Sequence, residues 1–133
     1  RTFTKAPGWK IIDGVRVYLR STWEFKYARF LSFLKANSLI LEWEYEPKTF
    51  WFEDIKRGVR SYIPDFKVTN LDGTHYWVEV KGYMDSKSKT KINRFKKYYP
   101  QEQLQVVDSK WFRSHQGKII LEEKGVENVV HDR

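Results

Sequence analysis

A tight turn between two extended segments constrains the fold of this chain more than any other sequence feature. The turn is Asn70-Leu71-Asp72-Gly73, in which Asp-Gly suits the positive φ angles of a β-hairpin. Alternating apolar and polar residues follow it over Thr74–Val80, and an extended run over Arg60–Thr69 precedes it. The sequence therefore predicts two antiparallel strands joined by this turn.

The other elements complete an α+β layout. A basic helix is expected from about Ser86 to Tyr99, with Pro100 just past its end. Residues 1–20 form either an irregular arm or a short hairpin around Asp13-Gly14, and the end of the chain is expected to fray. Further strands are expected at Leu39–Glu46, Thr49–Glu53, Leu104–Asp108 and the edge segment Lys118–Leu121, with a short helix at Ser109–Ser114. The order α-β-β-β-α-β predicts a central mixed β-sheet flanked by helices.

The first helix, from Ser21 to Asn37, has two possible uses for its acidic residue. Its apolar residues fall on one face at Trp23, Tyr27, Phe30, Leu31 and Leu34. The sequence Ser21-Thr22-Trp23-Glu24 is a capping box, in which Glu24 reaches back to the Ser21 amide. Glu24 also borders the apolar face, so its carboxylate can instead point towards the sheet. The roles of helix cap and site residue both stay open.

Positive charge is concentrated in one part of the chain. The 133 residues carry 25 Lys and Arg against 17 Asp and Glu, a net charge of +8, and residues 81–97 hold seven bases and one acid. A block this dense favours a polyanionic partner, because each neutralised phosphate releases condensed counterions. The alternative is a solvated helix face. Nucleic acid is favoured over an anionic membrane, since no strongly apolar face accompanies the charge.

Composition excludes several classes of protein. The length fits one domain with its own core. The absence of Cys excludes disulfides, thiolate zinc sites and a Cys nucleophile, and three scattered His residues leave little for a His-based metal site. No apolar run approaches the ~20 residues that a membrane span needs. No leader-like segment is apparent, so a cytoplasmic location is the default expectation.

Two carboxylates and a lysine are expected to meet on one surface. Strand alternation places Glu79 and Lys81 on the same face, and Asp65 comes beside Glu79 if the two strands pair through the turn. Mg²⁺ needs few hard oxygen ligands and keeps several waters. It would polarise a phosphodiester oxygen and lower the pKa of a water, while a nearby Lys can orient that water. The trio therefore predicts metal-dependent phosphodiester hydrolysis.

The Glu-x-Lys tripeptide alone is weak evidence for such a site. With 10 Glu and 16 Lys in 133 positions, chance gives about one such tripeptide, and the chain has four. Only Glu79-Val80-Lys81 ends an alternating strand, follows a Pro-Asp on the partner strand and precedes a basic helix. The context of Glu79-Val80-Lys81, rather than the tripeptide alone, identifies it as the candidate site.

Residues outside the trio divide into phosphate-contact candidates and residues with simpler roles. The phosphate-contact candidates are Arg20, Arg57, Arg60, Lys87, Lys89, Lys91 and Arg94. His75 is interpreted as a surface or DNA-contacting residue, and Glu46 as a charge at a strand end. Ser61 and Lys67 either contact phosphates or are exposed to solvent, and exposure is the favoured alternative. Trp51 and Phe52 are expected in the core rather than as platforms on which bases stack.

The arrangement of these residues resembles the PD-(D/E)XK nuclease superfamily. Glu24 on a first helix, Pro64-Asp65 and then Glu79-Val80-Lys81 follow its pattern over roughly Ser21 to Asp108. The resemblance implies a restriction-endonuclease-like core in a single nuclease domain, with an arm at 1–20, the catalytic core at 21–108 and an extension at 109–133. It further implies that Asp65, Glu79 and the Val80 carbonyl bind Mg²⁺, with Mn²⁺ as a substitute. Lys81 would position or activate the water, and Glu24 would match the helical acid.

Two branches of the superfamily are most similar. The small size and early helical Glu resemble archaeal-type Holliday junction resolvases, including phage-encoded ones. The segments Trp43–Pro47 and Tyr62–Phe66 also resemble small phage nucleases and transposase-associated endonuclease subunits. The resolvases usually carry a Gly-rich or Ser-containing strand start after the first helix, whereas Leu39–Phe52 is long and aromatic. This departure concerns the substrate rather than the nuclease chemistry.

The leading hypothesis is a Mg²⁺-dependent, structure-selective endodeoxyribonuclease, namely a phage Holliday junction resolvase. It would act as a symmetric homodimer on branched DNA, because two matched incisions need two sites. One alternative is a sequence-specific homing or restriction-type endonuclease, which needs side chains that read groove edges. The other is a non-catalytic DNA-binding accessory module for recombination. Neither a membrane nor a small-molecule substrate is expected.

Overall fold

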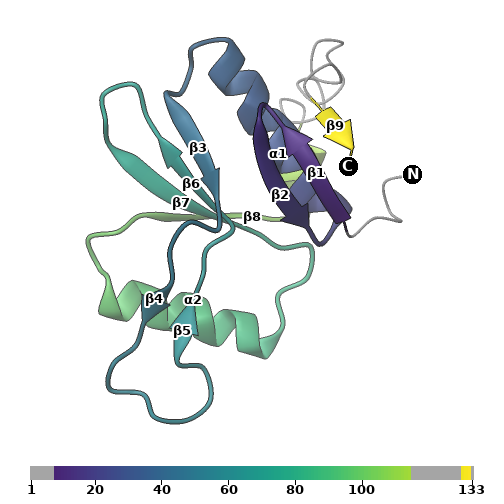
Figure 1. The fold of residues 1–133 in the computed structure, drawn as a ribbon. Helices are drawn as coiled ribbons and strands as arrows, with labels where there is room; N and C mark the ends of the chain where they lie inside the picture. Colours follow the sequence, from purple (N-terminus) through teal and green to yellow (C-terminus); the bar gives the residue numbers. More distant parts are fainter. Residues whose placement is uncertain (1–7, 115–129, 133) are drawn as a thin grey trace.

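The computed structural model describes residues 8–114 and 130–132 (Figure 1). The elements in chain order are β1 (Gly8–Ile12), β2 (Val15–Leu19), α1 (Thr22–Ala36), β3 (Glu42–Tyr45), β4 (Phe50–Trp51), β5 (Ser61–Tyr62), β6 (Phe66–Thr69), β7 (His75–Val80), α2 (Ser86–Tyr98), β8 (Leu104–Val107), α3 (Ser109–Arg113) and β9 (Val130–Asp132). A mixed four-stranded sheet lies between α1 and α2. The predicted α+β fold is therefore confirmed.

The central sheet has the strand order β3-β6-β7-β8. Strands β3, β6 and β7 are antiparallel, and β8 joins β7 in parallel after the crossover through α2. In the β6–β7 pair, Phe66 lies opposite Val78, so Asp65 comes opposite Glu79 one step further along. The predicted hairpin through Gly73, whose φ is 90°, is confirmed.

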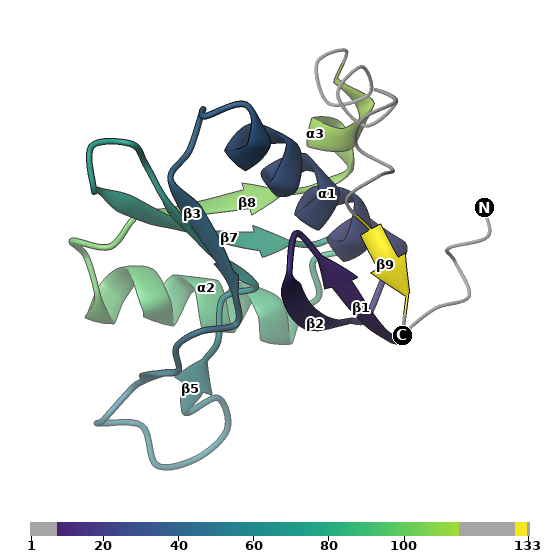
Figure 2. The ribbon, with the colours of Figure 1, turned by 45° about the horizontal axis from the view of Figure 1, so that its top comes forward.

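The two helices cover opposite faces of this sheet (Figure 2). Val78 and Val80 of β7 pack into the larger apolar cluster with Leu31 of α1. Trp77, the residue before Val78, packs into a second cluster with Phe95 of α2. Because neighbouring strand residues point to opposite faces, β7 is buried on both sides. The predicted alternation along this strand is confirmed.

Two hairpins flank the central sheet. The β1–β2 hairpin turns at Asp13 and Gly14, both with positive φ, which confirms the hairpin alternative for the first residues. Strand β9 pairs with β1, in a part of the chain that was expected to fray. The second hairpin, β4–β5, is a separate two-stranded sheet that joins β3 to β6. It packs on α2 through Phe50 and Tyr62, which contact Phe95.

Three sequence expectations about strands need correction. The extended run Arg60–Thr69 is two strands in different sheets, because the chain leaves the β4–β5 pair and passes Pro64 before β6 begins. The strand expected at Leu39–Glu46 is shorter, and Leu39 and Leu41 are exposed. The strand expected at Thr49–Glu53 covers only Phe50–Trp51.

Trp51 is the clearest error in the predicted core. Its side chain is 55% exposed, whereas Phe52 is buried as expected. Trp51 pairs with Ser61, and Phe50 pairs with Tyr62. The Phe50–Tyr62 pair faces α2, so the Trp51–Ser61 pair faces away from α2.

Two further expectations concern the ends of the chain and the helices. The edge strand expected at Lys118–Leu121 lies outside the described residues. The short helix expected at Ser109–Ser114 forms at Ser109–Arg113. No helix in the described part of the chain is long and apolar enough to cross a bilayer.

Candidate active site

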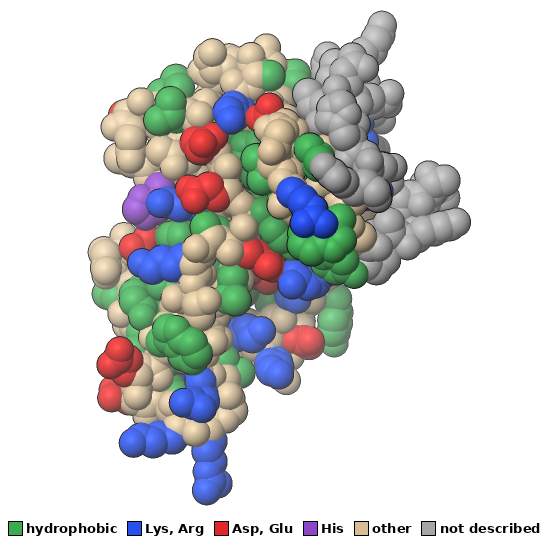
Figure 3. Space-filling model, viewed as in Figure 1, with side chains coloured by type: hydrophobic (Ala, Val, Ile, Leu, Met, Phe, Trp, Pro, Cys, Tyr) green, Lys and Arg blue, Asp and Glu red, His purple; other side chains and the backbone are tan. Residues whose placement is uncertain are grey.

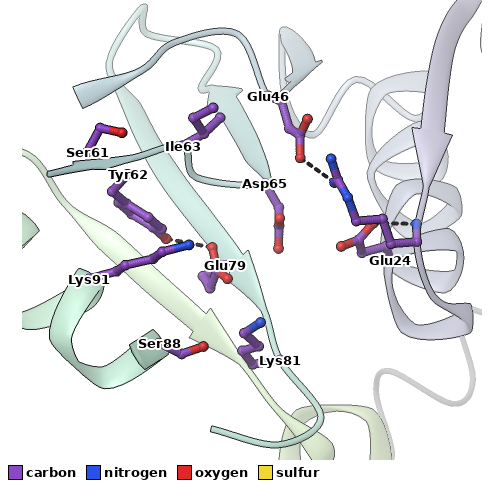
Figure 4. A pocket seen from close by; sticks show the side chains of 11 residues that line it. Glu24, Glu46, Ser61, Tyr62, Ile63, Asp65, Glu79, Lys81, Ser88 and Lys91 are labelled. Atoms are coloured by element: carbon purple, nitrogen blue, oxygen red, sulfur yellow. Dashed lines mark hydrogen bonds and ion pairs between the residues drawn. The ribbon is translucent and has the colours of Figure 1, made fainter. Parts of the chain in front are cut away.

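A polar pocket of about 370 Å³ opens where β5, β6, β7, α1 and α2 approach one another. Figure 4 shows Asp65, Glu79 and Lys81 pointing into one space, with Glu24 on one side and Ser88 and Lys91 on the other. The structure therefore brings together all four predicted catalytic residues. The complete lining is Arg20, Glu24, Glu46, Ser61, Tyr62, Ile63, Asp65, Glu79, Lys81, Ser88 and Lys91.

Asp65 and Glu79 lie side by side at the ends of paired strands. Asp65 is 7% exposed and Glu79 is 8% exposed. Oδ2 of Asp65 accepts a hydrogen bond from the Val80 amide over 2.7 Å, and the Asp65 carbonyl accepts one from the Glu46 amide. The carboxylate of Asp65 is thereby fixed to the end of β7, and its backbone is fixed to the residue that follows β3.

Burial and mutual repulsion disfavour negative charge on this pair. Burial raises the pKa of Asp65 well above its usual value, and the Glu79 and Glu24 carboxylates raise it further. Burial also raises the pKa of Glu79, although a hydrogen bond from Tyr62 and the positive charge of Lys81 act in the opposite direction. A cation between the two carboxylates would remove most of this cost.

Tyr62 is a site residue that the sequence did not identify. Its hydroxyl donates a hydrogen bond of 2.6 Å to Oε1 of Glu79, and the ring packs on Phe95 of α2. Burial beside Glu79 raises the pKa of the Tyr62 hydroxyl, so it remains a donor. From the sequence, Tyr62 is indistinguishable from the buried aromatic residues Phe50 and Phe52. The partner of its hydroxyl lies on a strand of another sheet, which no local pattern encodes.

Glu24 does not complete the predicted capping box. Oγ of Ser21 accepts a hydrogen bond from the Glu24 amide, so the serine half of the box forms. The Glu24 carboxylate instead accepts hydrogen bonds from the Arg20 amide at 3.0 Å and from the Tyr45 hydroxyl at 3.3 Å. It is buried and lines the pocket, so the carboxylate holds the residue before the N-cap and borders the site at once.

Arg20 is held at the rim by an acid. Its guanidinium forms an ion pair of 2.6 Å with Glu46 and donates to the Tyr45 hydroxyl. Glu46 has a positive φ of 47°, which turns the chain out of β3 next to the pocket. Glu46 lies at the end of β3, as expected, and in addition its carboxylate pairs with Arg20 in the pocket lining.

The remaining basic candidates occupy three different environments. Lys91 lines the pocket from α2, whereas Lys87 and Lys89 of the same helix are exposed. Arg94 donates to the carbonyl of Val59 over 2.5 Å and so secures the β4–β5 hairpin to α2. Two further candidates, Arg57 and Arg60, are exposed on that hairpin.

Three residues with simpler expected roles also have defined positions. Ser61 is half-buried and lines the pocket, and Lys67 is half-buried over the Trp77 ring, so neither is fully exposed, and a phosphate contact of either residue stays a prediction. His75 is exposed, as expected, and pairs with Glu102 at 3.0 Å. Glu102 also accepts a hydrogen bond from Trp77, so it ties the start of β7 to the turn before β8.

The donor set suits a hard cation with few protein ligands. Among the described residues, no three His, Cys, Asp or Glu side chains form a group that could hold a metal ion. Mg²⁺ is typically bound through one or two carboxylates and retains several waters. Asp65 and Glu79 are buried carboxylates, and neither forms an ion pair with another described residue. Their adjacent buried positions, with one oxygen of each outside the hydrogen bonds to Val80 and Tyr62, fit Mg²⁺ or Mn²⁺.

No protein-family model, curated protein or solved structure matches this chain.

Proposed function

We propose that the protein is a metal-dependent endodeoxyribonuclease that cleaves branched DNA, with Mg²⁺ as its cofactor. The observation that carries the proposal is the buried Asp65–Glu79 pair, which shares one pocket with Lys81. Two adjacent buried carboxylates without an ion-pair partner are costly in a metal-free fold. A phosphodiester hydrolase has a use for them, because a metal bound there would polarise the phosphate and activate a water.

Six residues in or beside the pocket would each have a defined part in this reaction. Asp65 and Glu79 would hold the metal, with the Val80 carbonyl as a third ligand. Lys81, on the same strand face as Glu79, would orient the attacking water and offset charge on the phosphate. Lys91 lies on the α2 side of the pocket and Arg20 on the α1 side, so both can contact phosphates next to the scissile bond.

The proposed substrate class follows from where positive charge is concentrated in the chain. Residues 81–97 carry six of the eight net positive charges, and α2 is formed from this segment. Phosphate contacts of this kind grip DNA without reading its sequence. Because such contacts do not depend on base edges, we propose that the protein recognises a DNA structure, such as a four-way junction, rather than a sequence. A homodimer would supply two sites for paired incisions.

Cleavage of defined DNA structures tests the proposal. The purified protein is incubated with Mg²⁺ and an end-labelled four-way junction, with its linear duplex arms or with a single strand. Asp65→Asn keeps an acceptor for the Val80 amide and removes the charge, and Asp54→Asn is the matched control in an exposed loop. Paired symmetric nicks in the junction alone, lost only in Asp65→Asn, are expected.

Other outcomes separate the alternatives. Cleavage of the linear duplex at one sequence would indicate a sequence-specific endonuclease. Junction binding without cleavage would indicate an accessory module. Cleavage that survives Asp65→Asn would contradict the proposed site.

A further inference from the structure

The β4–β5 hairpin presents a tryptophan beside the candidate active site. Trp51 is 55% exposed, although its two neighbours Phe50 and Phe52 are each 1% exposed. Trp51 pairs with Ser61, and paired residues of antiparallel strands point to the same side. Ser61 lines the pocket. The hairpin therefore borders the pocket through β5, and Trp51 lies on the paired strand β4 with its ring exposed to solvent.

The hairpin is held firmly against α2, so the ring has a fixed support. The Tyr99 hydroxyl donates a hydrogen bond of 2.6 Å to the Trp51 carbonyl, and Arg94 donates to the Val59 carbonyl. On the buried side, the Phe50 ring lies 4.8 Å from the Phe95 ring. These contacts use the backbone of Trp51 and the side chains of its neighbours. The indole itself is left available for a ligand.

The end of the hairpin carries charge that suits a polyanion. Figure 3 shows Lys and Arg side chains at the lower end of the molecule, where Figure 1 draws this hairpin, with acidic side chains to one side. The exposed cations there are Lys56, Arg57 and Arg60, and the exposed acids are Glu53 and Asp54. A solvent-facing aromatic ring flanked by cations is the arrangement that binds single-stranded nucleic acid, since bases stack on the ring and phosphates contact the cations.

We propose that the β4–β5 hairpin binds an unpaired nucleotide of the DNA substrate, with Trp51 as the ring on which its base stacks. This inference rests on the proposed function, because it takes the pocket beside Ser61 as the cleavage site. A base within a duplex is already stacked on its neighbours, whereas an unpaired base at a branch point offers a free face. The hairpin would therefore favour branched over fully paired DNA.

Binding without cleavage tests the inference. Affinities of the full chain are measured in EDTA for a fork with unpaired nucleotides at the branch and for a fully paired duplex of the same length. One unpaired position carries 2-aminopurine, whose fluorescence falls when it stacks. Trp51→Ala is expected to weaken binding of the fork by about 5- to 150-fold and to restore the fluorescence, with little effect on the duplex. Trp51→Phe should recover part of both.

The matched control is Trp9→Ala, which removes a 45% exposed tryptophan from the β1–β2 hairpin. Equal losses in Trp9→Ala and Trp51→Ala, or equal effects on fork and duplex, would overturn the stacking role. A change in sedimentation from dimer to monomer in Trp51→Ala would place this ring in a subunit interface instead, and would also overturn it.

Failure of this inference can be told apart from failure of the proposed function. If the wild-type protein and Trp51→Ala bind the fork equally well, only the stacking role is wrong. If the wild-type protein binds neither DNA, both proposals are wrong. Because no divalent metal is present, the result does not depend on whether the protein cuts DNA.

Discussion

The backbone amide of Val80 donates a hydrogen bond to Oδ2 of Asp65 over 2.7 Å. This bond joins the residue before β6 to the last residue of β7, so it sets the Asp65 carboxylate next to Glu79. Both carboxylates are buried, and their charges repel. The site is therefore a local source of instability in the metal-free protein.

The metal-free protein is expected to lose stability as the pH rises. Asp65 and Glu79 have folded-state pKa values above their ordinary values of 3.8 and 4.5, so the folded chain keeps protons that the unfolded chain has released. Stability then falls as the pH rises from these ordinary values through the raised ones. Other charged residues of the pocket also face the pair, namely the acids Glu24 and Glu46 and the bases Lys81 and Lys91. The measurement is the thermal midpoint in EDTA across this range.

Asp65→Asn isolates the contribution of the pair to this pH dependence. It is expected to raise the metal-free midpoint at neutral pH and to flatten its fall, while Asp54→Asn should leave both unchanged. Mg²⁺ should raise the wild-type midpoint at neutral pH and leave that of Asp65→Asn unchanged. A Mg²⁺ shift that persists in Asp65→Asn would show that the ion binds elsewhere.

Tyr62→Phe is expected to weaken Mg²⁺ binding by about 10- to 100-fold, because it removes the donor that orients Glu79. Isothermal calorimetry of Mg²⁺ binding measures this directly. The control is Tyr99→Phe, which also removes a hydroxyl donor with a bond of 2.6 Å, but one that bonds to the Trp51 carbonyl. Equal Mg²⁺ affinity in Tyr62→Phe and the wild type would make the Tyr62–Glu79 bond structural only.

Glu46→Gln is expected to tighten DNA binding several-fold at low salt. The change removes a negative charge from the pocket and frees Arg20 for a phosphate. Stability should change by less than about 1 kcal/mol, since the Arg20 side chain is 56% exposed and the pair is screened. Salt titration of DNA affinity checks the effect, which should shrink as salt rises.

Glu42→Gln is the control for this prediction. Glu42 lies on β3 and forms a similar surface ion pair of 2.8 Å with Lys35. Its loss removes the same charge at a position that does not line the pocket. A similar gain of affinity in Glu42→Gln would indicate that net charge alone, rather than release of Arg20, explains the result.

Phe95→Ala is expected to destabilise the protein by about 3–5 kcal/mol. The ring is fully buried on α2 and contacts Phe50, Tyr62 and Tyr99, so its loss opens a cavity under the β4–β5 hairpin. Urea unfolding measures the change. Leu71→Ala, at a site 60% exposed, should stay within about 0.5 kcal/mol of the wild type. A loss below 1 kcal/mol in Phe95→Ala would mean that the hairpin is not anchored there.

Secondary-structure elements with local sequence signals could be predicted before the structure was known. Turn chemistry at Asp72-Gly73, alternation along β7 and the apolar face of α1 each depend on neighbours a few residues away. The same signals paired Asp65 with Glu79, because a two-stranded hairpin has one register once its turn is fixed. They could therefore be predicted from the order of residues alone.

Side-chain contacts between elements that are distant in the sequence became apparent only in the tertiary structure. Tyr62 meets Glu79, and Arg20 meets Glu46, because separate sheets and helices pack against one another. The exposure of Trp51 depends on which side of the β4–β5 hairpin faces α2. Because Phe50, Trp51 and Phe52 are all aromatic, the sequence does not indicate which side is buried. These contacts depend on packing between parts distant in sequence, for which the chain carries no local signal.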